Sequence, residues 1–128
     1  MRILLVEPDE YYHAQFQRIL SDLAELQIAR SAEMALAMLA ANPPDLLILE
    51  LLLPDRPGYE VLDELRKRVN PSLPVIIFSR IGQIEDIGAA LDYGVTSFFV
   101  KGQDTINDIR KLLLTYKYDL QEPRSRTR

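Results

Sequence analysis

Cysteine is absent from the 128-residue chain, and histidine occurs only once, at His13. Without cysteine the chain cannot form disulfides, a thiolate zinc site or a cysteine nucleophile. A single histidine cannot make a metal site either, so we expect His13 to be an ordinary surface or boundary residue. No apolar run approaches the roughly 20 residues of a membrane-spanning helix, which argues against a membrane protein.

An excess of positive charge is also missing. The formal net charge is -4 and the sequence pI is about 5.0, whereas nucleic-acid binders normally carry a basic stripe. Three arginines near the C-terminus, Arg124, Arg126 and Arg128, are too few to change this. We therefore expect no nucleic-acid partner.

Glycine-rich nucleotide-binding motifs, internal repeats and low-complexity segments are missing as well. Neither GxGxxG nor a P-loop follows the first apolar run, so dinucleotide and nucleoside triphosphate sites have no support. The opening residues, MRILLVEPDE, turn acidic too early for a signal peptide, which favours a cytoplasmic location. The length suits one domain with its own core.

Five short apolar runs alternate with stretches of helical periodicity. The runs cover residues 3–6, 26–29, 46–49, 74–78 and 96–100, and the expected helices follow each of them. Such alternation predicts an α/β domain, with a parallel sheet, right-handed crossovers and helices on both faces.

Individual residues predict where these helices begin and which side they bury. Asp9, Ser31 and Asp104 are expected N-caps. In the helix expected over residues 83–93, the spacing of Ile84, Ile87 and Leu91 predicts that these side chains face the core. Gly94 then suits the position just after the helix.

Four predicted strands end in polar side chains, namely Glu7, Glu50, Ser79 and Lys101. The carboxyl ends of parallel strands lie side by side, about 4.8 Å apart between neighbours. We therefore expect two carboxylates, a hydroxyl and an ammonium to converge there as a phosphate-handling or ion-pair site. Glu50, at the end of an apolar run buried on both faces, is the strongest single candidate.

Four stretches resemble the receiver domain of two-component response regulators: ILLVEPDE, PDLLILELLLPDRPGYEVL, LPVIIFS and GVTSFFVKG. The resemblance covers about nine-tenths of the chain. It implies a flavodoxin-like fold, which is a three-layer α-β-α sandwich around a doubly wound, five-stranded parallel sheet of order 2-1-3-4-5. Residues 1–118 would form the receiver and 119–128 a flexible C-terminal tail.

The resemblance also implies a role for each strand-end residue. Glu7 corresponds to the first acid of the pair that binds Mg²⁺ in the family, and Glu50 to the aspartate that accepts a phosphoryl group. Ser79 and Lys101 correspond to the residues that contact this phosphoryl group. Phe98 corresponds to the aromatic residue that turns inward or outward with the functional state.

Three departures from the family pattern affect this chemistry. Pro8 stands where the second acid belongs and has no side-chain ligand atom, while Asp9 is one residue late. Glu50 is one methylene longer than aspartate, which displaces its carboxylate by about 1.5 Å, and a misplacement near 1 Å can cost about 10²-fold in rate. Mg²⁺ usually needs one or two carboxylates. We therefore expect no phosphorylation and no Mg²⁺ cofactor.

The longer Glu50 side chain has two possible placements. In the first hypothesis it forms a permanent ion pair with Lys101, which fixes one conformational state. In the second, the site has decayed and Glu50 faces solvent. Arg80 stands where the family usually has a small residue and could cover the pocket, and Gly102 replaces the usual proline, which puts the family's cis peptide in doubt.

The resulting functional hypothesis is an atypical, stand-alone receiver that is not an enzyme and acts by binding a protein, such as a sensor kinase or a downstream regulator. One alternative is a phosphorelay receiver that is phosphorylated, with Glu50 at the acceptor position. A remote alternative is a phosphatase of the haloacid dehalogenase type, whose Asp-x-Asp motif Glu7-Pro8-Asp9 resembles only loosely. A DNA-binding regulator is disfavoured.

A possible homodimer surface involves the fourth helix, the fifth strand and the fifth helix. Its candidate apolar residues equally fit a generous core face: Ile81, Tyr93, Leu112, Leu114 and Tyr118. Tyr11 and Tyr12 are expected to be packing residues. Asp55 and Arg56 are expected to be solvated turn residues, although Arg56 could approach Glu50.

Overall fold

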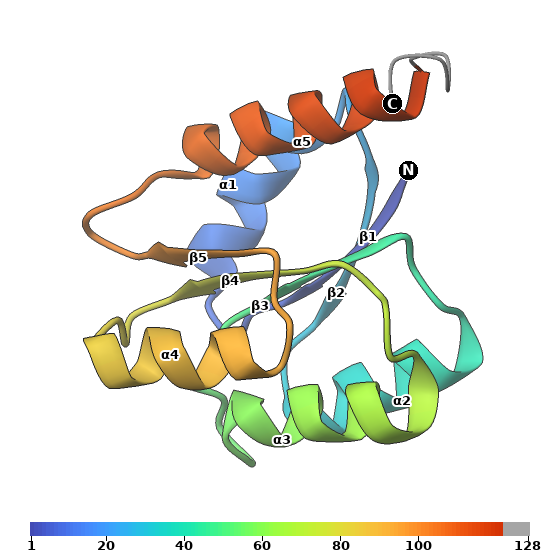
Figure 1. Cartoon of the computed structure of the whole chain (residues 1–128). Coiled ribbons are helices and arrows are strands. Elements are labelled where there is room, and N and C mark those ends of the chain that lie inside the picture. The colour runs from blue at the N-terminus through green and yellow to red at the C-terminus, as the bar shows by residue number, and fades with distance from the viewer. Residues whose placement is uncertain (122–128) are drawn as a thin grey trace, which may run out of the picture.

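The computed structural model describes the backbone of residues 1–121 and the side chains of residues 1–116. Strands and helices alternate along this part of the chain (Figure 1). The strands are β1 (Arg2–Val6), β2 (Glu25–Ala29), β3 (Leu46–Leu49), β4 (Val75–Ser79) and β5 (Ser97–Val100). The helices are α1 (Glu10–Leu20), α2 (Ala32–Ala41), α3 (Gly58–Glu64), the π-helical turn η1 (Leu65–Val69), α4 (Ile84–Asp92) and α5 (Ile106–Gln121).

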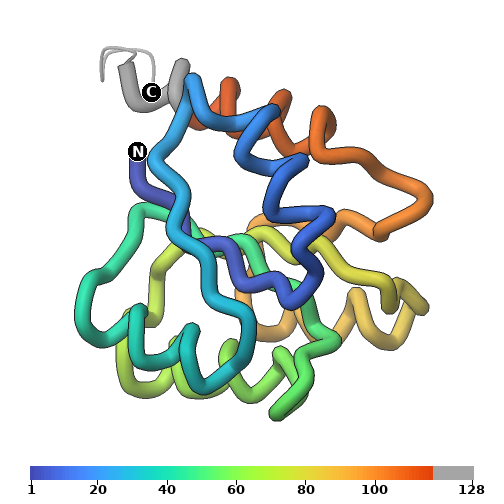
Figure 2. The backbone as a smooth tube through the Cα atoms, turned by 180° about the vertical axis from the view of Figure 1, so that it is seen from behind, coloured from blue at the N-terminus to red at the C-terminus, as the bar shows by residue number. Residues whose placement is uncertain are grey.

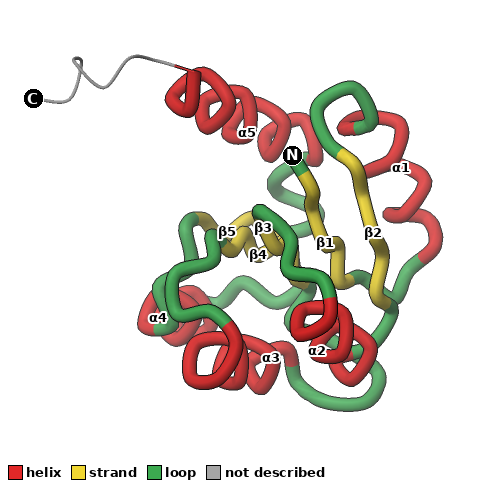
Figure 3. Tube along the Cα trace, turned by 90° about the vertical axis from the view of Figure 1, so that its right-hand side faces the viewer, coloured by secondary structure: helices red, strands yellow, loops and turns green. Residues whose placement is uncertain are grey.

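The five strands form one parallel sheet of order β2-β1-β3-β4-β5, as predicted. Figure 3 shows β1 and β2 side by side. The register pairs Val6 with Leu49 and Ser79 with Val100. As a result, the residues that follow β1, β3 and β5 reach the same edge of the sheet as Ser79.

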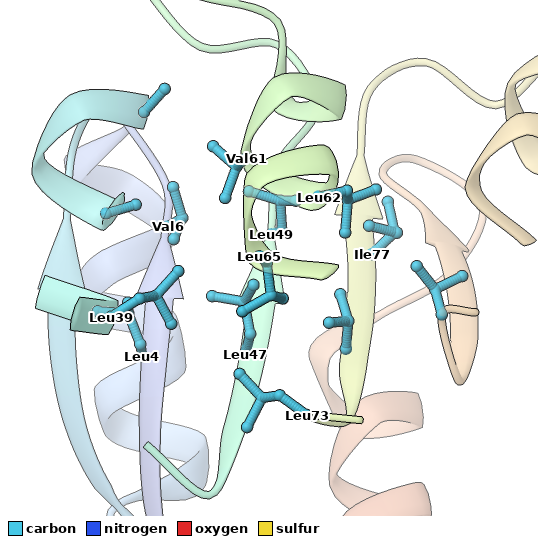
Figure 4. Close-up of a cluster of buried hydrophobic side chains, with 14 of the residues drawn as sticks. Leu4, Val6, Leu39, Leu47, Leu49, Val61, Leu62, Leu65, Leu73 and Ile77 are labelled. Atoms are coloured by element: carbon cyan, nitrogen blue, oxygen red, sulfur yellow. The ribbon is translucent and has the colours of Figure 1, made fainter. Parts of the chain in front are cut away.

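Helices cover both faces of the sheet. Helices α1 and α5 lie next to each other on one face (Figures 1 and 2), and α2, α3 and α4 cover the other. Figure 4 shows the core between the sheet and the second group, where leucines of β1 and β3 contact leucines of α2, α3 and η1. No helix among residues 1–121 is long and apolar enough to cross a bilayer.

The predicted N-caps are confirmed for two helices and wrong for a third. Asp9 accepts a hydrogen bond from the backbone of Tyr11, and Ser31 caps α2 in the same way. Asp104, by contrast, accepts from the backbone N–H of Val100 at 2.8 Å. The backbone N–H of Asp108 donates to the Thr105 hydroxyl, and the backbone N–H of Thr105 donates to the Asp108 carboxylate. Thr105 is therefore the N-cap of α5, one residue later than predicted.

The predicted inward face of α4 is wrong for two of its three residues, while the third, Ile87, is half-buried. Ile84 is 84% exposed and Leu91 is 53% exposed, whereas Ala90 is the buried residue of this helix. Periodicity fixes the spacing of apolar residues but not which side of the helix meets the sheet, and α4 meets it through the side that carries Ala90. Gly94 follows α4 with φ +74°, as expected for a residue after a helix.

His13 is buried, at 8% exposure, and does not lie at the surface or boundary position that we predicted. The buried positions of α1 are His13, Phe16 and Leu20, which places the histidine on the side of the helix that faces the sheet. The His13 Nε2 atom makes a hydrogen bond with the backbone oxygen of Glu7. The histidine therefore ties α1 to the end of β1.

The loop between β3 and α3 is more ordered by polar contacts than predicted. Asp55 is exposed, but its carboxylate accepts hydrogen bonds from the backbone N–H groups of Ala32 and Glu33, at 2.9 Å each. These bonds lower the pKa of Asp55. Arg56 turns to the acids of α3 and lies 3.5 Å from both Glu60 and Glu64, so it does not approach Glu50.

Candidate functional site

The residues predicted at the strand ends converge on one buried cluster. The Lys101 Nζ atom, directly after β5, lies 2.7 Å from Glu7 Oε1 and 2.7 Å from Glu50 Oε2. The side chains of Lys101, Glu7 and Glu50 are 4%, 1% and 1% exposed. We call these three residues the ion triad. It bridges the ends of β1, β3 and β5.

Both carboxylate oxygens of Glu50 are occupied by donors of the protein itself. Oε1 accepts from the Ser79 hydroxyl and, at 2.9 Å, from the backbone N–H of Leu52. Oε2 accepts from Lys101 and, at 3.3 Å, from the backbone N–H of Arg80. Glu50 thus points into the site, as the first hypothesis states, and does not face solvent.

Glu7 is as deeply buried as Glu50 but accepts fewer hydrogen bonds. Its Oε1 accepts from Lys101, and its Oε2 accepts from the backbone N–H of Asp9 at 3.1 Å. Burial raises the pKa of Glu7 above its ordinary value, although the hydrogen bond and the charge of Lys101 partly offset this effect. Two carboxylates share a single ammonium, so the triad carries an excess negative charge when both acids are ionised.

An open pocket of ≈ 310 Å³ lies over the triad and is also lined by Pro8, Asp9, Leu52 and Arg80. The Asp9 carboxylate caps α1 through Oδ1, and its Oδ2 lies 3.4 Å from Arg80 Nη2. The Arg80 side chain is 62% exposed. The Arg80–Asp9 pair therefore joins the β1–α1 and β4–α4 loops beside the pocket.

The β4–α4 loop is drawn onto the site by its backbone. Besides its bond to Glu50, the Ser79 hydroxyl accepts from the backbone N–H of Ile81 at 3.2 Å. Gly82 then passes so close to β5 that a Cβ atom there would lie 2.5 Å from Val100 Cγ2. The loop can follow this path because residue 82 has no side chain.

The remaining predicted residues lie on β5 and just after it. Phe98 is partly buried and packs against the core under α2, α3 and α4. Gly102 has φ +92°, and no peptide bond in residues 1–121 is cis.

The donor set differs from the oxygen-rich environment that Mg²⁺ prefers. Glu7 and Glu50 are bound to an ammonium, Pro8 supplies no side-chain donor, and Asp9 is engaged with α1 and Arg80. Among the residues that the structure describes, no group of three or more His, Asp or Glu side chains is arranged to hold a metal ion.

Two aromatic residues at the triad were not assigned to the site from the sequence. The Lys101 ammonium lies 4.2 Å from the centroid of the Tyr12 ring and 5.6 Å from that of Phe78. Their positions in the sequence could have indicated a place near the site. Tyr12 lies in the first turn of the helix that follows β1, and Phe78 directly precedes Ser79.

A doubly wound sheet of this order, with acids after β1 and β3, a hydroxyl at the end of β4 and a lysine after β5, defines a receiver-type α/β domain. The family model of the response regulator receiver domain matches residues 3–113. The chain therefore belongs to the response regulator receiver domain family of two-component signalling.

Individual relatives agree with this assignment. The chain is 30% identical to the transcriptional regulatory protein MalR of Bacillus subtilis over 91% of its own length and 53% of that protein. It is 28% identical to the regulator of RpoS of Escherichia coli K12, again over 91% of this chain but 35% of that protein. The chain thus spans about half or less of these curated relatives.

The fold is shared with a solved two-component response regulator from Clostridium difficile, at a TM-score of 0.85 and 20% identity. The match covers 95% of this chain and 99% of that one.

Proposed function

We propose that this receiver domain is a protein-interaction module that accepts no phosphoryl group and binds no Mg²⁺. The observation that carries the proposal is the Lys101 ammonium, which lies between the two acids that correspond to the metal ligand and the phospho-acceptor of the family. In this proposal, the Lys101 ammonium supplies the positive charge that a divalent ion supplies in the family.

Phosphoryl transfer depends on exact positioning and on neutralisation of charge by a metal ion. Here a metal would have to displace Lys101 from two contacts of 2.7 Å and would find no second acid, because residue 8 is proline. The Glu50 carboxylate would also have to leave the Ser79 hydroxyl and two backbone N–H groups before it could attack. Both requirements act against the same reaction step.

The internal contacts of Glu50 suggest what the site does instead. They hold the β4–α4 loop to the sheet without an added ligand. The domain therefore presents one fixed surface to a protein partner, such as a sensor kinase or a downstream regulator, in the cytoplasm.

The homodimer surface across α4, β5 and α5 remains part of this proposal, but with a different composition. Among the side chains of α4 and α5 that the structure describes, Ile84, Leu91 and Leu114 are the large exposed apolar ones. Ile81, Tyr93 and Leu112 instead pack partly against the core. The side chain of Tyr118 and all of Arg124, Arg126 and Arg128 lie outside the described residues.

Intact-mass measurement separates the proposal from a phosphorylated receiver. We expect the wild-type chain to keep its mass after incubation with a small-molecule phosphodonor and Mg²⁺. A matched variant, Pro8→Asp combined with Glu50→Asp, restores the family's acids and is expected to gain one phosphoryl group. A phosphoryl adduct on the wild-type chain, at Glu50 or elsewhere, would overturn the proposal. The family assignment leaves the phosphatase alternative without support.

A further inference from the structure

We infer that Tyr12 is the positioning residue that keeps the Lys101 ammonium between Glu7 and Glu50, by closing its third side with the face of an aromatic ring. The inference rests on the proposed function, because it explains how a flexible lysine stays in the site permanently. It also turns Tyr12 from a packing residue of α1 into a part of the site.

The two carboxylates leave one N–H group of the Lys101 ammonium without an oxygen partner, on the side where the Tyr12 ring lies. A lysine ammonium has three N–H donors. Two of them are used by Glu7 and Glu50, at 2.7 Å each. No third oxygen acceptor for this group is found within the described residues, and the Tyr12 ring centroid lies 4.2 Å from Nζ.

The Lys101 side chain is only 4% exposed, and a buried ammonium needs favourable partners for all three of its N–H groups. The face of an aromatic ring carries partial negative charge and attracts a cation, and more strongly where water is excluded. The ring thus replaces the water molecule or oxygen ligand that the third N–H would otherwise need. A non-aromatic side chain would leave the third N–H without a partner, and Lys101 could then turn out of the site.

The Tyr12 ring is itself held in place by other rings. It packs edge-to-face on Phe78, with centroids 5.5 Å apart and an interplanar angle of 88°. Phe78 packs in the same way on the buried Phe16 of α1. The ring is therefore fixed by the core between α1 and β4 and is not free to follow the lysine.

The chain offers a matched pair of variants for this inference. No hydrogen bond of the Tyr12 hydroxyl is found among the described residues, so Tyr12→Phe keeps the ring and loses nothing that holds Lys101. Tyr12→Met keeps a large apolar side chain that fills the gap but has no π face. The two variants separate the ring's electrostatic effect from simple packing.

The test is the rate at which acetic anhydride modifies each lysine at neutral pH, followed by peptide mass spectrometry. Lys67 and Lys111 are exposed internal references. We expect Lys101 to be protected in the wild type and in Tyr12→Phe, and to react about tenfold faster in Tyr12→Met, a size within the cation–π range. The references should react alike in all three proteins.

Equal protection of Lys101 in Tyr12→Met and in the wild type would overturn the inference. So would faster modification accompanied by an equal loss of amide-exchange protection in β3, because that result reports general unfolding. The intact-mass experiment above uses only the wild type and its acid-restored variant. A phosphoryl adduct there would remove the proposed function even if Lys101 depends on the ring, so the two failures are distinguishable.

Discussion

Lys101 is the shared ion-pair partner of two buried carboxylates, so its removal has consequences that an ordinary surface lysine would not have. A buried ion pair adds little net stability compared with apolar packing, because both charges had to leave water. Loss of one partner is different, since the other charge then stays buried without compensation. Replacing all three residues of the triad by apolar ones should therefore change stability little, whereas removing Lys101 alone should lower it strongly.

We predict that Lys101→Met lowers the free energy of unfolding at pH 7 by about 3–5 kcal/mol, the range seen when one partner of a buried pair is removed. The methionine roughly fills the space of the lysine stem, so the loss reports mainly the uncompensated charges of Glu7 and Glu50. Urea unfolding measures it, and Lys111→Met, at an exposed position of α5, is the control. No loss relative to this control would count against a stabilising triad.

The raised pKa of Glu7 should make the free energy of unfolding depend on pH. Burial raises its folded pKa above the ordinary value of 4.5, so between these two values the folded chain binds more protons than the unfolded chain. Stability from this group therefore declines as the pH rises from about 4.5 through the folded pKa. Unfolding curves at several pH values should show this decline in the wild type and lack it in Glu7→Gln. A difference between the two proteins that grows in the wild type's favour with pH would contradict the assignment.

The strand-end residues were predictable because a polar side chain directly after a buried strand lies at the carboxyl edge of the sheet, where neighbouring strands also end. The contacts of Glu50 and Lys101 followed from this topology. Tyr12 was not predictable in the same way, because its apolar ring satisfies the helical spacing of α1 equally well as a core residue. Its second role depends on the exact position of the Lys101 ammonium, which sequence patterns do not contain.

At the scale of elements, the β4–α4 loop connects the triad to α4. Its backbone donates to Glu50 and to Ser79, and it crosses β5 at Gly82. Any change that lifts this loop should weaken the Glu50 contacts and loosen the start of α4.

We predict that Gly82→Ala destabilises the domain, because the new Cβ would meet Val100 Cγ2 at 2.5 Å and Cγ1 at 2.9 Å. The added volume forces the loop away from β5, and overpacking of this kind typically costs about 1–3 kcal/mol. The second substitution Val100→Ala should recover part of this loss by making room. A thermal-unfolding double-mutant cycle measures the coupling, and strictly additive effects would show that the loop does not pack on β5 as described.

The elements themselves were largely predictable, whereas the packing side of α4 and the polar contacts of the β3–α3 loop were not. The β-branched and leucine runs fixed all five strands to within a residue. The sequence spacing of Ile84 and Leu91 was helical, as predicted, but both side chains are exposed because α4 packs through Ala90. Asp55 caps a helix that lies 23 residues earlier in the chain, and no local pattern indicates such a partner.

At the scale of the whole molecule, the domain keeps the receiver architecture and fills the centre of its site with its own side chains. The sheet order, the helix layers and the strand-end lysine agree with the family. Lys101 lies between Glu7 and Glu50 in this site. Under the proposed function, the site needs no metal ion and acts as a fixed connection between β1, β3, β4 and β5.

The most direct test is an amide ¹H–¹⁵N NMR spectrum of the wild-type chain with and without Mg²⁺ and beryllium fluoride, a mimic of the phosphoryl group. The proposal that Lys101 replaces the external cation predicts unchanged resonances for the residues around Glu7, Glu50, Ser79 and Lys101. The Pro8→Asp, Glu50→Asp variant should respond under the same conditions. Saturable shifts of these four residues in the wild type would contradict the central claim.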